Sequence, residues 1–350
     1  MRGGTSKGLI FHADHLPADP AARDRILLRA MGSPDAAQID GVGGATTLTS
    51  KVAMVRRSGR PDADVDYLFA QVDVTAPVVD TNPSCGNILS AVAPYAVESG
   101  MVAAQPGETT VRIFNENTRT VSTAIVRTPD GQVTYDGDTR IDGVPGTAAP
   151  VKLDLAATAG SRTGKLLPTG SPRDMIRGVE VSCVDMATPM VLIPAAALGR
   201  SGYESKRELD ADPQLLARVE EIRREASHIM GLGDATGKVI PKVALLAAPR
   251  YGPGITSRYF VPHLCHASHA VTGAVCIAVA TGLEGSVAHD LAHLPDGPRR
   301  TVRIEHPAGE LAVELEMNSG RFPTPDVRRA AVVRTARRLF EGSVVLPHDV

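Results

Sequence analysis

Apolar residues recur along this chain in two different patterns, and the commoner one predicts β-strands. Short runs that alternate or stay apolar for five to ten residues, with turn-forming residues between them, are typical of strands and dominate the first half. Asp130-Gly131 is a suitable hairpin turn between two of the runs. The predicted strands cover residues 52–56, 65–74, 109–114, 121–128 and 132–135.

The second pattern predicts two helices that are apolar on nearly every face. Residues 86–97 and residues 272–280 contain no charged side chain. A helix without a polar face must be surrounded by protein. Strands wrapped around one buried helix, twice over, is the economical arrangement, so we expect an α+β protein with two similar domains. Pro94 should kink or shorten the first of these helices.

Three further segments complete the expected organisation. Residues 213–230 predict an amphipathic surface helix, and residues 163–178, rich in Gly, Pro and Ser, predict a linker. Residues 332–340 predict a helix whose arginines, Arg334 among them, are solvated.

These segments set the expected domain boundaries. The first domain is expected to hold residues 1–172, joined by a C-terminal strand at 342–350, and the second to hold residues 173–341.

Composition excludes several classes of partner. The net charge is −2 without a basic cluster, and Trp is absent, so nucleic acid and anionic membranes are not expected partners. The start of the chain has no apolar signal core, and the four cysteines form no CxxC pair. We expect reduced thiols and a cytoplasmic location. The oligomeric state stays open, with a homodimer as a candidate.

Lys51 and Cys85 are the two residues that carry the most chemical information. Alternation places Lys51 on one strand face with Ala53 and Val55, and an apolar neighbourhood makes a lysine amine easier to deprotonate. Cys85 directly precedes the apolar helix of residues 86–97, where the positive end of the helix dipole favours a thiolate. An amine base and a thiol together suggest proton transfer at carbon. The alternatives are an exposed strand lysine and a small buried cysteine.

The starts of the two apolar helices suit a ligand with several carboxylates, because helix-start N–H groups bind anions. Ser6 could bind a carboxylate or could be an ordinary turn serine, and Arg258 could clamp one bidentately. The residues expected to bind substrate are Thr5, Gly86, Asn87, Arg258, Ser268, His269, Thr272 and Gly273.

Neither a metal nor a nucleotide is expected. His263, His266 and His269 recur every three residues with Cys265 between them, but this spacing in a Pro-containing, strand-like segment without a carboxylate does not favour a metal site. Residues 3–8 are rich in glycine but lack the order of a phosphate-binding loop, and no strand precedes them.

The same segments make the sequence recognisable as a whole. It resembles the cofactor-independent isomerase family that includes 2-methylaconitate isomerase, 3-methylitaconate isomerase and 4-oxalomesaconate tautomerase. Residues 64–72 and 41–51 look closest to the tautomerase branch. The resemblance rests on residues 1–8, 31–35, 38–44, 48–53, 64–72, 85–89, 142–147, 305–310 and 334–337.

The resemblance implies a diaminopimelate-epimerase-like fold: two similar domains, each a barrel-like sheet around a central helix, with the active site between them. It implies that Lys51 is the proton-transferring base and that Cys85 and Ser6 line the site. Epimerases of the wider fold that use two thiols carry a second cysteine just before the second central helix. Ala270 stands at the matching position here, so a two-cysteine racemase is disfavoured.

The expected activity is therefore a cofactor-independent isomerisation or tautomerisation of an unsaturated di- or tricarboxylate. 4-Oxalomesaconate is the first substrate to test, and 2-methylaconitate or 3-methylitaconate isomerisation is the alternative. A carboxylate-binding protein without activity is the alternative of another class.

Overall fold

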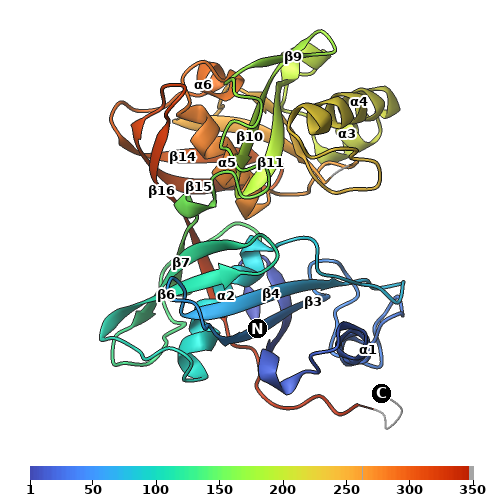
Figure 1. Ribbon diagram of the computed structural model, residues 1–350, viewed down its shortest axis with the longest axis vertical. Coiled ribbons are helices and arrows are strands. Elements are labelled where there is room, and N and C mark those ends of the chain that lie inside the picture. Colours follow the sequence, from blue (N-terminus) through green and yellow to red (C-terminus); the bar gives the residue numbers. More distant parts are fainter. Residues whose placement is uncertain (262, 347–350) are drawn as a thin grey trace. The chain divides into compact units, whose positions relative to one another are not determined.

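The chain folds into two compact units, shown in a computed structural model that describes residues 1–261 and 263–346 (Figure 1). Unit 1 holds Met1–Leu153 and resumes at Val333, and unit 2 holds Asp154–Val332. The chain passes from unit 1 to unit 2 within strand β8 and returns within strand β16.

Unit 1 contains one central helix, α2, and a curved layer of strands. Its elements are β1 (Arg2–Gly3), β2 (Ser6–His12), η1 (Ala13–His15), α1 (Pro20–Met31), β3 (Lys51–Arg57), β4 (Val65–Val72), β5 (Val79–Asp80), α2 (Gly86–Glu98), β6 (Gly107–Asn115), β7 (Thr120–Thr128) and β8 (Pro150–Asp154).

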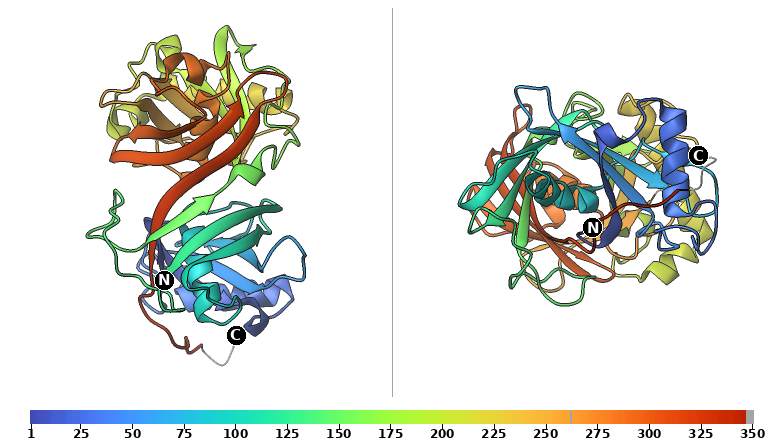
Figure 2. Two further views of the ribbon diagram at one scale, coloured as in Figure 1. Left: turned by 90° about the vertical axis from the view of Figure 1, so that its left-hand side faces the viewer. Right: turned by 90° about the horizontal axis from the view of Figure 1, so that it is seen from below.

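The strands of unit 1 enclose α2 because this helix has no polar side to offer to water. β1–β2, β3–β4 and β6–β7 are antiparallel pairs, while β2–β3 and β4–β6 are parallel. Helix α2 contacts β1, β2, β3, β4, β6 and β7, and the view from below shows it inside the ring of strands (Figure 2). Pro94 does not shorten the helix, which continues to Glu98.

A second apolar layer in unit 1 lies on the other face of the β2–β3–β4 sheet. Leu27, Ala30 and Met31 of α1 pack there against residues such as Val52 and Met54 of β3. The side chains of β3 thus alternate between this layer and the face toward α2.

Unit 2 has the same construction around helix α5. Its elements are η2 (Ala156–Thr158), β9 (Asp174–Ile176), β10 (Val179–Met186), β11 (Thr188–Pro194), η3 (Ala195–Leu198), α3 (Lys206–Asp210), α4 (Pro213–Ile229), β12 (Lys242–Ala247), β13 (Gly254–Phe260), α5 (Val271–Thr281), α6 (Val287–Leu291), β14 (Arg299–His306), β15 (Gly309–Ser319) and β16 (Asp326–Arg337).

The strand order of unit 2 repeats that of unit 1. β10–β11, β12–β13 and β14–β15 are antiparallel pairs, while β11–β12 and β13–β14 are parallel. Helix α5 contacts β10, β11, β14 and β15, and ten of its eleven residues are buried. Helix α4 packs on the opposite face of the sheet, over Val243 and Leu245. The two expected apolar helices are therefore confirmed, and α4 confirms the expected surface helix.

Three segments differ from the sequence predictions. Residues 332–340 form no helix: β16 runs to Arg337, and Arg334 on it is buried, with a pKa lowered to about 10 chiefly by desolvation. Residues 132–135 form no strand. Residues 342–346 are not a strand either, and the rest of the expected C-terminal strand lies outside the described residues.

The expected linker at 163–178 is held firmly in unit 2. The buried carboxylate of Asp185 on β10 accepts hydrogen bonds from the backbone N–H groups of Arg162 and Thr163, each at 2.8 Å. Residues 154–172 belong to unit 2. Along the chain, the boundaries between the units therefore fall at 153/154 and 332/333, whereas we expected them at 172/173 and 341/342.

Among residues 1–261 and 263–346, no helix combines the length and the apolar character that a membrane span requires.

Substitution of Gly3 tests how closely β1 packs on α2. A Cβ atom at this position would lie 2.4 Å from the backbone oxygen of Asn87. We expect Gly3→Ala to lower the free energy of unfolding by about 1–3 kcal/mol, because neither backbone can give way. Urea unfolding should show the loss. Gly59→Ala is the control, since a Cβ there has no neighbour within 4 Å; equal stability of the two variants would contradict this packing.

Candidate active site

Lys51 lies on the face of the β2–β3–β4 sheet opposite α1 in unit 1. Gly8 of β2 and Gln71 of β4 are the register partners of Lys51, so their side-chain positions lie on the same face. Ala53 and Val55, on this face with Lys51, are fully buried, whereas Lys51 keeps 9% of its surface exposed. The expected strand position of Lys51 and its apolar neighbourhood are confirmed.

The ammonium group of Lys51 is held by a neutral partner and an aromatic ring. Lys51 Nζ donates a hydrogen bond to Gln71 Oε1 at 2.9 Å and lies 5.2 Å from the centroid of the Phe69 ring. The Gln71 amide is fixed in turn, because it donates to the backbone oxygen of Ser50 at 2.8 Å. In the described part of the chain, Lys51 makes no ion pair with a carboxylate. The amine is thus oriented without being neutralised.

Cys85 is the N-cap residue of α2, as the sequence predicted. Its thiol makes no capping hydrogen bond and its side chain is partly exposed, while its carbonyl oxygen accepts from Leu89 N–H and from the hydroxyl of buried Tyr67. The first N–H groups of a helix have no acceptor within the helix and carry positive partial charge. The thiol therefore stands beside donors suited to an anion.

Two asparagines fix the loop that leads into α2. Asn115 donates to Ser84 Oγ at 2.7 Å, and Asn117 donates to the backbone oxygen of Thr81 at 2.7 Å. Both lie at the end of the β6–β7 hairpin and are buried. They set where the chain turns toward Cys85, although neither stood out in the sequence.

Thr5 and Asn87 bind one another. The Asn87 amide donates to Thr5 Oγ1 at 3.1 Å and its Oδ1 accepts from Thr5 N–H at 3.4 Å. Gly4 permits this contact, because it has φ +49° and a Cβ there would lie 2.1 Å from Asn87 Oδ1. Both side chains are used in positioning the N-terminal turn against the start of α2.

Ser6 follows directly on this turn, and its hydroxyl is buried without a partner. The residue is 2% exposed, and Ser6 Oγ has no hydrogen bond within the described residues. A buried hydroxyl that makes no hydrogen bond is unfavourable for folding. Its retention here is explained if a ligand supplies the missing bond.

The candidates of unit 2 gather at the start of α5. His269 Nδ1 lies 2.9 Å from the carbonyl oxygen of Ala270, which can only accept, so Nδ1 carries the proton. In the neutral imidazole Nε2 is then the acceptor, and the Ser257 hydroxyl donates to it at 3.0 Å. Both residues are buried, and the Tyr259 ring lies 4.9 Å from the imidazole.

Helix α5 itself begins against this cluster. A Cβ at Gly273 would lie 2.4 Å from the ring of Tyr259, so glycine is needed for the close packing. Thr272, in the first turn, is partly exposed, as is Ser268, whose N–H donates to His266 Nδ1 at 2.9 Å.

Arg258 already makes hydrogen bonds within unit 2. It occupies the β13 face opposite to Ser257 and Tyr259, since neighbouring residues of a strand point to opposite sides. Its guanidinium donates to the backbone oxygens of Glu204 at 2.6 Å and Ser257 at 3.1 Å, and burial lowers its pKa. The hydrogen bond to Glu204 ties Arg258 to the loop before α3, and its role in substrate binding stays a prediction.

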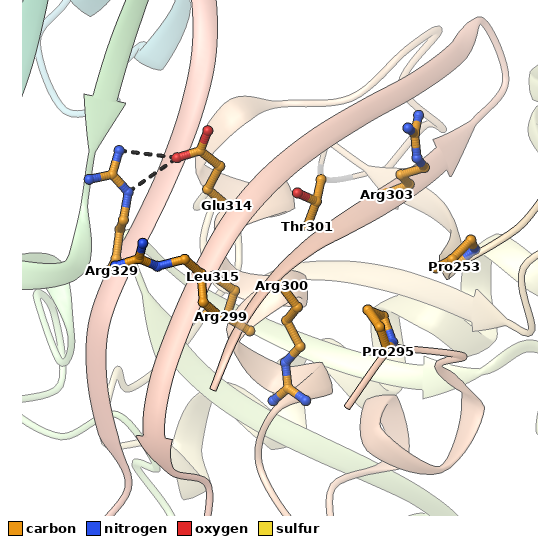
Figure 3. Close-up of a pocket in the computed structure, with 9 residues that line it drawn as sticks. All are labelled: Pro253, Pro295, Arg299, Arg300, Thr301, Arg303, Glu314, Leu315 and Arg329. Atoms are coloured by element: carbon orange, nitrogen blue, oxygen red, sulfur yellow. Dashed lines mark hydrogen bonds and ion pairs between the residues drawn. The ribbon is translucent and has the colours of Figure 1, made fainter. Parts of the chain in front are cut away.

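A hollow of about 830 Å³ in unit 2 contains none of these candidates (Figure 3). It is lined by Arg299, Arg303 and Arg329 from β14 and β16, but each of these cations is paired with a glutamate: Glu316, Glu310 and Glu314, respectively. Arg300 also lines the hollow; it makes no ion pair among the described residues, and its buried Nε has no hydrogen-bond partner. Glutamates therefore compensate three of the four arginines that line the hollow.

No group of three His, Cys, Asp or Glu side chains within residues 1–261 and 263–346 is arranged to hold a metal ion.

The profile of the PrpF protein family matches residues 1–347. The chain belongs to this family. It is 52% identical to the 4-oxalomesaconate tautomerase of Pseudomonas putida, covering 100% of this chain and 95% of that protein. It is 50% identical to the (4E)-oxalomesaconate Delta-isomerase of a Novosphingobium species, over 98% of this chain and 95% of the relative. The family membership predicted from the sequence is thus confirmed.

Solved structures confirm the expected diaminopimelate-epimerase-like fold. The crystal structure of methylitaconate-delta-isomerase superposes with a TM-score of 0.87 at 38% identity, covering 98% of this chain and 93% of that one. A hydroxyproline epimerase from Agrobacterium vitis shares the fold alone, with a TM-score of 0.52 at 14% identity.

Ser6 offers a test of the site that is independent of any substrate. Because its buried hydroxyl has no partner, we expect Ser6→Ala to leave the free energy of unfolding unchanged or to raise it slightly. Ser50→Ala is the matched control: its buried hydroxyl donates to Val72 O at 2.9 Å and accepts from Gln38, so its loss should cost about 1–3 kcal/mol. Urea unfolding of both variants measures this difference. If Ser6→Ala loses as much unfolding free energy as Ser50→Ala, the ligand-binding interpretation is refuted.

Proposed function

We propose that this protein is an isomerase that moves a proton on an unsaturated polycarboxylate, with 4-oxalomesaconate as its substrate. The observation that carries the proposal is that unit 1 holds a constrained amine, Lys51, and a thiol at a helix start, Cys85, in a chain about half identical to two oxalomesaconate isomerases. The reaction requires a base, an acid and stabilisation of an enolate-like charge.

Lys51 is the proposed base. In its neutral form the amine has one lone pair and two N–H groups. One N–H is directed to Gln71 Oε1, which limits how the lone pair can turn. The amine takes a proton from the carbon next to the conjugated system, and the electron pair left on that carbon delocalises into the alkene, ketone or carboxylate. A proton then returns at another atom of the same system, so no electrons are gained or lost.

The start of α2 is the proposed acid and anion-binding group. The N–H groups of Gly86 and Asn87 stand at the positive end of the helix dipole, which stabilises a carboxylate or a developing enolate. The Cys85 thiol donates or relays the returning proton, and the Ser6 hydroxyl hydrogen-bonds the substrate. Thr5 and Asn87 hold this turn in place. In unit 2 we retain Ser268, His269, Thr272 and Gly273 as proposed binding residues.

The proposal includes independence from metals and organic cofactors, and a cytoplasmic location. The described cysteines are all free thiols, which suits a reducing compartment. A homodimer remains the candidate assembly, and light scattering of the purified protein would establish it.

The alternative activity is that of the 3-methylitaconate isomerase of Eubacterium barkeri, to which the chain is 39% identical over 98% of its length. A panel of unsaturated polycarboxylates in deuterated water, followed by NMR, separates the alternatives. We expect solvent deuterium to enter 4-oxalomesaconate first, while a carboxylate-binding protein without activity would introduce none.

Lys51→Met should lower the rate of this exchange by about 10²- to 10⁴-fold, the usual contribution of a general base. Circular dichroism should show that the variant is folded. Lys165→Met, which removes an exposed lysine, is the control and should retain the full rate. More than half of the wild-type rate in Lys51→Met would exclude Lys51 as the base.

Cys85 should be the first cysteine to react with iodoacetamide at neutral pH, and a saturating polycarboxylate should protect it. It is partly exposed, whereas Cys183, Cys265 and Cys276 are buried, and burial raises the pKa of all three, that of Cys265 to about 11. Peptide mass spectrometry reads the order of labelling. Equal rates for all four thiols, or labelling of Cys85 that ligand does not slow, would remove it from the site.

A further inference from the structure

The repeated strand order of the two units gives Lys51 a counterpart, Lys242. In unit 1, β3 follows β2 after a helical crossover, lies parallel to β2 and pairs antiparallel with β4, and α2 comes next. In unit 2, β12 follows β11 after a helical crossover, lies parallel to β11 and pairs antiparallel with β13, and α5 follows. Lys51 is the first residue of β3, and Lys242 is the first residue of β12.

The two lysines also occupy the corresponding face of their sheets. Val243 and Leu245 of β12 face helix α4, so Lys242 and Ala244 lie on the other face. Ala244 pairs with Tyr259, whose ring packs against Gly273 in the first turn of α5. Lys242 therefore lies on the face opposite α4, as Lys51 lies on the face opposite α1. Each lysine is 9% exposed.

Lys242 differs from Lys51 in having no acceptor for its amine. Within residues 1–261 and 263–346 it makes neither a hydrogen bond nor an ion pair. The one charged group that acts on it is Arg223 of α4, another cation, which is itself bound by Glu220. Helix α5 and strand β11 carry no ionisable side chain except Cys276. Helix α6, which contacts β12, carries His289 and Asp290, and Asp290 is paired with Arg173.

The side-chain amine of Lys242, which has no acceptor, is in an unfavourable environment in the unliganded protein. Desolvation, followed by the charge of Arg223, lowers the pKa of Lys242 to about 8. At neutral pH the amine is still mostly protonated, because one pH unit corresponds to a tenfold ratio of the two forms. A buried ammonium group without a counter-ion is energetically costly unless an anion approaches it. Within the described residues, no carboxylate is paired with Lys242.

We propose that Lys242 is a carboxylate-binding residue of unit 2, the counterpart of Lys51, and that its counter-ion is a carboxylate group of the ligand. The choice of a carboxylate, rather than another anion, rests on the proposed function. The site itself rests on the repeat, on the low exposure of Lys242 as a residue and on the absence of an acidic partner in the described residues.

Binding of tricarballylate, a saturated tricarboxylate that cannot isomerise, tests this proposal without turnover. Isothermal titration calorimetry at neutral pH should give a Kd for Lys242→Met at least about tenfold weaker than for the wild type. Lys238→Met is the matched control: Lys238 is exposed and lies four residues away, so its variant should bind normally. Sulfate at the same concentration should compete poorly, and equal competition would contradict a carboxylate site.

A purely structural role for Lys242 makes the opposite predictions. Lys242→Met would then be less stable to urea and would bind tricarballylate as tightly as the wild type, which overturns the proposal. Under the proposal the variant is at least as stable as the wild type, because an uncompensated charge has been removed. In the deuterium-exchange assay it should raise KM by about tenfold or more and change kcat less.

A measurement on the wild-type chain covers the case in which Lys242→Met fails to fold. After reductive ¹³C-methylation of the lysines, NMR should show the Lys242 signal titrating at a higher pH when tricarballylate is bound, because an anion stabilises the ammonium form. No binding, or no shift of this signal, overturns the carboxylate site. Binding without deuterium exchange of any substrate leaves the site standing and rejects the proposed activity.

Discussion

The architecture depends on the enclosure of two helices that have no polar surface. Nine of the thirteen residues of α2 and ten of the eleven of α5 are buried, which is possible only if strands surround each helix on most sides. Antiparallel and parallel pairs therefore alternate in the same order in both units. Only the end of such a helix can meet a ligand, and the candidate residues Cys85 and Thr272 lie where α2 and α5 begin.

Close backbone packing at the starts of α2 and α5 determines which polar side chains remain available to bind a ligand. Gly3 and Gly4 bring the N-terminal turn onto Asn87, and Gly273 brings α5 onto Tyr259. The amide of Asn87 and the imidazole of His269 are then engaged within the protein. Ser6, Cys85 and the two buried lysines are left with polar groups that internal contacts do not fully satisfy.

The sequence predicted what depends on local pattern and missed what depends on pairing. Alternation was enough to place Lys51, and an apolar run after Cys85 was enough to place α2. The segment around Arg334 has helix-like spacing, but pairing with β15 and β1 makes it a strand. Gln71 and Lys242 drew no attention because their importance follows from register and from missing partners. The face of Arg258 on β13 could not be assigned either, because that assignment requires its strand neighbours.

The return of the chain to unit 1 within β16 has a consequence for how the protein is made. Gly3 pairs with Ala336, Gly4 N–H donates to Thr335 O, and Arg2 donates to the same residue. A ribosome synthesises these partners more than 300 residues apart, with all of unit 2 between them. During translation, strand β1 therefore has no β16 partner until all of unit 2 has been synthesised. A nascent chain that lacks β16 cannot assemble the complete N-terminal turn. We therefore expect such a chain to lack the complete candidate site around Ser6.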